Sequence, residues 1–99
     1  MTNAEQLAAL RAEIDRIDVA LVGLIAERTR VVRRVMVLKT DEESVRGCDR
    51  VRIVLDKVRA LAEAEEIDPS IAERTYKSLI EALTDMQLEY LRQRQQQEA

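Results

Sequence analysis

Apolar residues recur at alternating intervals of three and four positions along the N-terminal part of the chain. The series consists of Leu7, Leu10, Ile14, Ile17, Leu21, Leu24, Val31, Val35 and Leu38. Arg28 occupies the one position of this series, between Leu24 and Val31, that is not apolar. Such spacing places one apolar stripe along a single helix, as in a coiled coil. We therefore predict one long helix from about Glu5 to Lys39.

Few residues in the chain can interrupt a helix. The sequence holds two glycines and one proline, and it is rich in Ala, Leu, Glu and Arg, which favour helices. A polar break at residues 40–44 precedes a second helix that starts between Val45 and Asp49. Asp68 followed by Pro69 is typical of a helix start, because Asp caps the first turn and proline fits its first position. The prediction is an all-α fold of three helices, one long and two shorter.

The two shorter helices carry apolar stripes of their own. In the second helix the residues expected to face inward are Val51, Val54, Val58 and Leu61. In the third helix they are Ala72, Tyr76, Leu79 or Ile80, Leu83, Met86 or Gln87, Tyr90 and Leu91. The three helices form one predicted domain over residues 5–92, and the Gln-rich segment 93–99 is expected to fray.

The long helix extends beyond what the rest of the chain can cover. About 35 residues at 1.5 Å each span roughly 52 Å, whereas a globule of this size has a radius of gyration of about 13 Å. The apolar stripe follows the whole helix, and the two shorter helices cover only part of it. We predict an intertwined helical homodimer in which the long helices of two copies pack together. A monomeric helical hairpin is the alternative.

The composition excludes several kinds of chemistry. The chain has no His and a single Cys, Cys48, so the common zinc sites and the nucleophiles that histidine activates lack their parts. We expect no metal and no cofactor. No apolar run is long enough to cross a membrane and no signal peptide is recognisable, so we expect a cytoplasmic protein without a membrane partner. A net charge of -3 and 2% aromatic residues disfavour nucleic acid as a partner.

Polar residues that interrupt the apolar stripes are the candidate site. Arg supplies 13 of the 16 basic residues, and its planar guanidinium suits carboxylates and phosphates. Arg28 breaks the first stripe, and Lys39 points almost the same way on the predicted helix from about 16 Å further along. Gln87 interrupts the third stripe, where a buried amide needs a hydrogen-bond partner. A small anion fits between the two cations. The alternative for Arg28 is that it extends to solvent or pairs with a carboxylate of the same protein, and the alternative for Gln87 is that it lies in water at the edge of its stripe.

Two further arginine positions bear on the site. Arg50 opens the second helix beside Arg46 and Arg52, at an end that favours anions, and one of the three is expected to join the site. Arg11 precedes Arg28 by about 100° around the helix and some 25 Å along it, so the two cannot bind one small ligand within a chain. An antiparallel partner helix would bring Arg11 of the partner subunit close to Arg28.

Several segments of the chain together match one known pattern. They are the run LRAEIDRID at 10–18, the step Ala26-Glu27-Arg28, Lys39, the connection VRGCDR at 45–50, and Gln87. With these segments the chain resembles the all-helical chorismate mutase family, including its isochorismate-pyruvate lyase relatives, from about Leu7 to Tyr90. The resemblance implies an intertwined three-helix dimer and a cofactor-independent isomerase that converts chorismate, a dicarboxylate enol-pyruvyl ether, to prephenate. Such an enzyme holds the substrate folded and stabilises the charge that grows on its ether oxygen.

The resemblance also implies roles for individual residues. Arg28 and Arg11 of the partner subunit would bind the substrate carboxylates. Lys39 and Gln87 would donate hydrogen bonds to the ether oxygen, and Arg50 would supply a further cation close by. Because the rearrangement needs no covalent intermediate and no proton transfer, it is consistent with a chain that lacks His.

The chain departs from the family pattern at three positions around the substrate ring. Gly47 stands where Asp is usual, Val51 where a Glu receives the ring hydroxyl, and Leu83 where a small hydroxyl residue is usual. These changes leave the preference among ring substituents open. An isochorismate-pyruvate lyase, which has a similar apolar residue after Arg50 and a similar ending at 87–93, or an aminodeoxychorismate mutase is the alternative. A helical dimer without catalytic activity is a second alternative.

Overall fold

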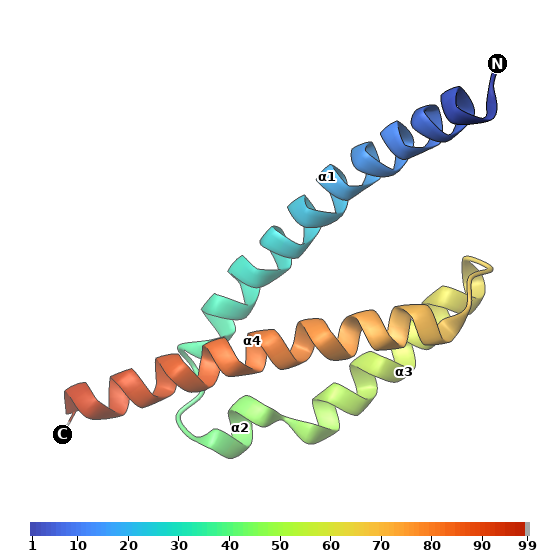
Figure 1. The fold of residues 1–99 in the computed structure, drawn as a ribbon. Coiled ribbons are helices and arrows are strands. Elements are labelled where there is room, and N and C mark those ends of the chain that lie inside the picture. The colour runs from blue at the N-terminus through green and yellow to red at the C-terminus, as the bar shows by residue number, and fades with distance from the viewer. Residues whose placement is uncertain (99) are drawn as a thin grey trace. The chain divides into compact units, whose positions relative to one another are not determined.

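A computed structural model describes residues 1–98 (Figure 1). The described chain forms four helices, α1 (Asn3–Met36), α2 (Glu42–Arg46), α3 (Cys48–Ala64) and α4 (Pro69–Glu98), and residues 1–98 contain no strand. The predicted all-α fold is confirmed, and the three main helices are joined by one short helix that was not predicted. The chain divides within α1 into two units, Met1–Val32 and the residues from Arg33 onward. Whether these units act as one domain over residues 5–92 stays a prediction.

α1 starts at a reciprocal cap formed by Thr2 and Glu5. The backbone N–H of Glu5 donates to Oγ1 of Thr2 over 3.1 Å, and the N–H of Thr2 donates to Oε1 of Glu5 over 3.4 Å. This arrangement satisfies amide groups that the first helical turn leaves unpaired. The helix then continues for 34 residues, a length of about 51 Å. The long N-terminal helix is therefore confirmed.

The C-terminal end of α1 differs from the prediction. The helix ends at Met36, and the N–H groups of Leu38 and Lys39 donate to the carbonyls of Val35 and Met36 over 3.0 and 3.2 Å. These short-range bonds form a tight turn after the last helical residue. The prediction that the helix continues to Lys39 is wrong, so counting helical turns from Arg28 does not give the direction of the Lys39 side chain.

The polar segment after this turn contains α2. Oδ1 of Asp41 accepts a hydrogen bond from the N–H of Ser44 over 2.7 Å, which caps the helix and holds the pKa of the Asp41 carboxyl below its ordinary value. Gly47 ends the helix in the left-handed conformation, with φ 47° and ψ 53°. α3 begins at the next residue, within the range that the sequence predicts.

Replacing Gly47 tests this connection. Gly47→Ala is expected to lower the free energy of unfolding by about 1 kcal/mol, because a residue with a Cβ is disfavoured in the left-handed conformation. An added Cβ would lie 3.5 Å from the carbonyl oxygen of Ser44, an ordinary contact, so the loss is conformational rather than steric. Urea denaturation followed by circular dichroism measures it. Gly23→Ala within α1 is the control and is not expected to destabilise the chain; equal unfolding midpoints for both variants would contradict the prediction.

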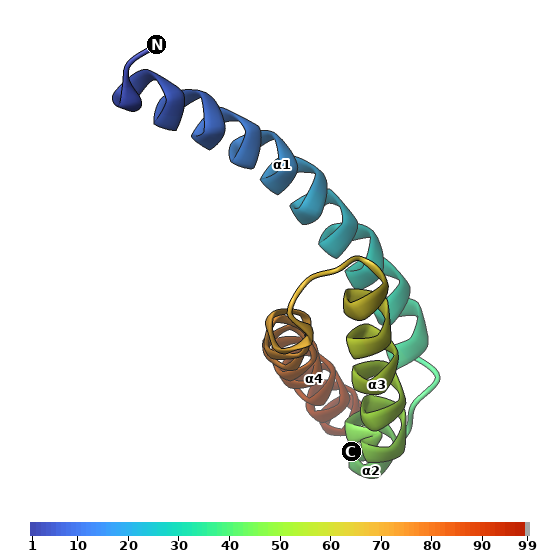
Figure 2. The same cartoon turned by 90° about the vertical axis from the view of Figure 1, so that its right-hand side faces the viewer.

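α3 and α4 pack side by side in the second unit (Figures 1 and 2). Its buried residues are Val45 from α2, Val58 and Ala62 from α3, and Leu83, Gln87 and Leu91 from α4. The buried residues of α4 all lie on the predicted stripe. On α3 the prediction holds for Val58 but not for Leu61, which is 56% exposed. Ala62 is buried instead because it follows Val58 by one turn, and its small side chain lets the two helices approach closely.

An ion pair joins these two helices at their surface. Nη1 of Arg59 on α3 lies 2.6 Å from Oε2 of Glu73 on α4, and Nζ of Lys77 lies 3.1 Å from Oε1 of the same carboxylate. Hydrogen bonds from both cations hold the pKa of Glu73 below its ordinary value.

At the start of α4, Oδ1 of Asp68 accepts from the N–H of Ser70 over 2.9 Å, which confirms the predicted cap ahead of Pro69.

The C-terminal part of α4 is helical as far as Glu98. The segment 93–98, which the sequence predicts to fray, therefore belongs to the helix, while Ala99 lies outside the described residues. Leu91 is buried, and the side chain of Arg94 reaches the turn that follows α1.

None of the helices in residues 1–98 combines the length and the apolar character that crossing a bilayer requires.

Candidate active site

The structure joins two of the predicted site residues directly. Nζ of Lys39, in the turn after α1, donates to Oε1 of Gln87 on α4 over 3.2 Å. Lys39 is half-buried, and Gln87 is only 6% exposed. Residues 48 positions apart in the chain thus form one part-buried polar pair. We refer to this as the Lys39–Gln87 pair.

The amide of Gln87 has a defined orientation. Its oxygen accepts from Lys39, and its Nε2 donates to the backbone carbonyl of Leu83 over 3.2 Å. In the described chain every fully buried side-chain nitrogen and oxygen has a hydrogen-bond partner. An amide nitrogen carries two N–H groups and a lysine ammonium carries three. One N–H of Gln87 and two of Lys39 therefore remain for a ligand.

Apolar side chains occupy two of the three positions at which the family pattern has polar ones, and Gly47 occupies the third. Leu83 is buried one turn before Gln87 on the same face of α4. Val51 is half-buried in the first turn of α3, and its N–H donates to the carbonyl of Gly47 over 2.9 Å. Neither side chain can form a hydrogen bond to a ring substituent, so both can contribute only shape and an apolar surface.

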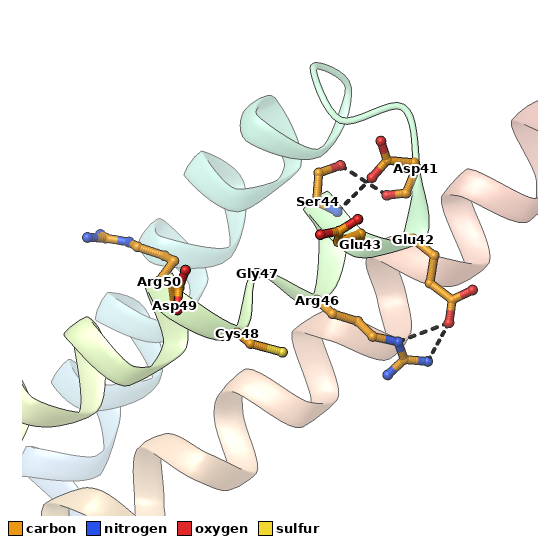
Figure 3. Close-up of a pocket in the computed structure, with 9 residues that line it drawn as sticks. All are labelled: Asp41, Glu42, Glu43, Ser44, Arg46, Gly47, Cys48, Asp49 and Arg50. Atoms are coloured by element: carbon orange, nitrogen blue, oxygen red, sulfur yellow. Dashed lines mark hydrogen bonds and ion pairs between the residues drawn. The ribbon is translucent and has the colours of Figure 1, made fainter.

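The three arginines around the start of α3 differ in their partners. Nε and Nη2 of Arg46 lie 2.9 Å from the same carboxylate oxygen of Glu42, and Nη2 of Arg52 lies 3.9 Å from Oδ1 of Asp49. The guanidinium of Arg50 has no hydrogen bond or ion pair within residues 1–98, and Figure 3 shows it extending away from Arg46. Of the three, Arg50 is the one whose charge is not already neutralised by a neighbour.

Two of these arginines line an open concavity, which is formed by the cap of α2, α2 itself, Gly47 and the first turn of α3. Its lining residues are Asp41, Glu42, Glu43, Ser44, Arg46, Gly47, Cys48, Asp49 and Arg50 (Figure 3). Four carboxylates against two guanidiniums give it a net negative charge. The concavity includes neither Lys39 nor Gln87, and a dianionic ligand would be repelled there. It is therefore not the predicted site.

The two remaining predicted site residues, Arg11 and Arg28, lie on α1 in the first unit. They belong to one uninterrupted helix, so their seventeen-residue separation corresponds to about 25 Å along its axis. This confirms the spacing on which the prediction of a shared site depends. Their roles as binding residues stay predictions.

Arg94 also belongs to this region, although it is not among the predicted site residues. Nη1 and Nη2 of Arg94 donate to the backbone carbonyls of Val37 and Lys39, each over 3.2 Å. A usable signal was present, because Arg94 follows Gln87 by seven residues and therefore lies two turns further along the same face. It was not predicted because it lies in the segment expected to fray.

No group of His, Cys, Asp and Glu side chains within residues 1–98 is arranged to hold a metal ion.

Comparison with known proteins points to one family. The pattern of chorismate mutase type II matches residues 10–88. A chorismate mutase of Methanocaldococcus jannaschii is 30% identical over 92 residues, which cover 92% of this chain and 93% of that protein. The bifunctional chorismate mutase/prephenate dehydratases of Escherichia coli K12 and Shigella flexneri are each 33% identical over 82 residues, 82% of this chain but 21% of their own length. The chain therefore belongs to the chorismate mutase type II family.

Proposed function

We propose that this chain is a chorismate mutase, an isomerase that converts chorismate to prephenate without a cofactor. The observation that carries the proposal is the Lys39–Gln87 pair, which presents unused N–H donors from a largely buried position. Membership of the chorismate mutase type II family and similarity to the relative from Methanocaldococcus jannaschii support it. A cytoplasmic location is part of the same proposal.

The pair suits the charge that develops during this reaction. The ether C–O bond breaks while a C–C bond forms within the same molecule, and negative charge grows on the ether oxygen. Donors already aimed at that oxygen stabilise the transition state more than the ground state, and they do so most strongly where water is excluded. The hydrogen bond between Lys39 and Gln87 holds both donors in place before the substrate arrives. In this role Gln87 must donate through Nε2.

Binding of the two carboxylates is assigned to arginines. Arg28 and Arg11 of the partner subunit would each bind a carboxylate with a two-pronged guanidinium, and Arg50 would add positive charge nearby. These contacts hold the flexible substrate in the folded geometry that the rearrangement needs. Val51 and Leu83 would then border the ring with apolar surface.

The exposed apolar surface of α1 supports a homodimer. Its stripe residues Leu7, Leu10, Ile14, Ile17, Leu21 and Leu24 are between 46% and 63% exposed. A contiguous apolar stripe of this length in water is unfavourable, and a second copy of the same helix can cover it symmetrically. We propose that two copies pair through α1 and that each lends Arg11 to the other's site.

Mixing two inactive variants tests the shared site. Arg11→Ala and Arg28→Ala are each expected to lose most activity. In a heterodimer, one site keeps Arg28 from one protomer and Arg11 from the other. After co-refolding at equal amounts, half the dimers are heterodimers with one intact site of two, so the mixture should recover about one quarter of wild-type activity. A mixture no more active than the mean of the separate variants would contradict exchange of Arg11.

The substrate preference is tested by offering three candidates to the wild-type protein. Chorismate, isochorismate and aminodeoxychorismate are incubated separately, and loss of the diene absorbance is followed while products are identified by mass spectrometry and NMR. We expect conversion of chorismate to prephenate. Preferential turnover of isochorismate with release of pyruvate, or of aminodeoxychorismate, would replace the proposed substrate. Absence of turnover for all three would favour a non-catalytic helical dimer.

A further inference from the structure

The turn that carries Lys39 is attached to α4 at two points. The side chain of Lys39 donates to Gln87, and the backbone carbonyls of Val37 and Lys39 accept from Nη1 and Nη2 of Arg94. Gln87 and Arg94 lie two turns apart on the same face of α4. The main chain of the turn is thus bound by Arg94 and its functional side chain by Gln87. Arg94 lies beyond residues 10–88, the part that matches the family pattern.

The carbonyls bound by Arg94 have no helical partner. α1 ends at Met36, and carbonyls at and after a helix C-terminus lack the N–H groups of a following turn. A guanidinium donates from two nitrogens in a fixed planar geometry, so it can bind two such carbonyls at once. Its positive charge is also favourable at the negative end of the helix dipole. Arg94 therefore acts as a C-terminal cap for α1, supplied by a different helix.

Arg94 is itself held in place by its neighbours on α4. Its guanidinium carbon lies 5.9 Å from the centre of the Tyr90 ring, and its Nε lies 3.8 Å from Oε1 of Glu98. Its side chain is only 24% exposed. Each nitrogen of the guanidinium thus has a partner, and the side chain has little freedom to leave the turn. Such a residue fixes the position of what it binds.

We propose that Arg94 is a positioning residue for Lys39, which it holds in reach of Gln87 and of the substrate by fixing the backbone on both sides of Leu38. The proposal rests on the catalytic role of Lys39 proposed above. Arg94 does not touch the substrate in this account. Its loss should therefore affect the chemical step, which needs Lys39 in place, much more than binding of the substrate carboxylates by other arginines.

Steady-state kinetics with chorismate separates this role from a general effect on folding. Arg94→Ala is expected to lower kcat by about 10-fold or more, because small displacements of a catalytic group have large effects on rate. KM should stay within about threefold of the wild-type value. Arg94→Lys keeps the charge but cannot bind both carbonyls with a planar fork, so it should restore kcat only in part. The matched control is Arg92→Ala, which removes an exposed arginine of the same helix that pairs with Glu89.

A double-mutant cycle gives the readout that a merely structural residue would not change. If Arg94 acts through Lys39, removing Arg94 from a Lys39→Ala protein should have no further effect on kcat. A structural residue would lower kcat by the same factor in both backgrounds. The proposal would be overturned if the double variant lost kcat by the product of the two single losses. It would also be overturned if Arg94→Ala had the same kcat as Arg92→Ala.

Hydrogen exchange tests the same proposal without relying on activity. Amide exchange of a peptide spanning residues 37–41, read by mass spectrometry, is expected to be faster in Arg94→Ala than in the wild type or in Arg92→Ala. Unchanged exchange would overturn the positioning role even if kcat fell. If the wild-type protein fails to convert chorismate, the proposed function fails, while the exchange experiment still decides whether Arg94 orders the turn.

Discussion

Lys39→Ala is expected to lower kcat for chorismate by on the order of 10²-fold or more, since it removes the charged donor proposed to face the ether oxygen. The side chain is half-buried and donates to Gln87 over 3.2 Å. Its removal would leave the oxygen of the Gln87 amide without its partner, so the orientation of that amide would suffer as well. Stopped-time assays of prephenate formation at saturating chorismate measure the effect on kcat.

The matched control for this variant is Lys57→Ala. Lys57 is exposed on α3, and its removal changes the net charge by the same amount without touching the Lys39–Gln87 pair. Its kcat should remain close to that of the wild type. Circular dichroism spectra of both variants establish that the helices are retained. A Lys39→Ala protein that works at nearly the wild-type rate would exclude Lys39 from the chemical step.

Gln87→Glu is the second variant with a large expected effect, and its signature is a dependence on pH. An ionised carboxylate at this position accepts but cannot donate a hydrogen bond, and it places negative charge beside an oxygen that is itself becoming negative. At neutral pH kcat should fall by about 10²-fold. As the pH falls through the pKa of the new carboxyl, the protonated form regains an O–H donor and kcat should rise.

The direction of this pH dependence follows from the chemistry of the two side chains. An amide does not titrate, so the wild-type protein should show no comparable rise at low pH. Burial raises the pKa of a carboxyl, whereas the neighbouring Lys39 ammonium lowers it. Gln87→Met serves as the control, because it removes the donor without adding a titrating group and its lower kcat should not vary with pH. A Gln87→Glu protein with an activity that is flat in pH would count against donation by residue 87.

The helices were predictable because their signals are local. The heptad spacing of apolar residues predicts α1, and the pair Asp68 and Pro69 predicts the start of α4. The end of α1 was not predictable from local patterns, because no glycine or proline marks it. It is set by a turn whose carbonyls are bound by Arg94, more than fifty residues away. Sequence spacing places Arg94 on the same face of α4 as Gln87, but it does not show that this face meets the turn after α1.

The pairing of two candidate site residues was partly predictable for a related reason. Gln87 stands out because it replaces an apolar residue on a regular stripe, and the structure buries it at that position. Lys39 was identified by resemblance and by an assumed helical geometry, and although that geometry is wrong, the turn still brings its Nζ to Gln87. Arg94 was missed because the surrounding Gln-rich sequence resembles a solvated tail. Which of Leu61 and Ala62 faces α4 depends on how closely the two helices approach, and that is a property of packing rather than of spacing.

A crystal structure with a bridged bicyclic dicarboxylate ether, a stable mimic of the folded substrate at the transition state, would show which side chains bind the ether oxygen and the two carboxylates. We predict that Nζ of Lys39 and Nε2 of Gln87 both lie within about 3.2 Å of the ether oxygen. We also predict that Arg28 and Arg11 of the partner subunit bind the two carboxylates. An ether oxygen that contacts neither Lys39 nor Gln87, or a ligand bound elsewhere on the chain, would rule out the proposed role of the Lys39–Gln87 pair.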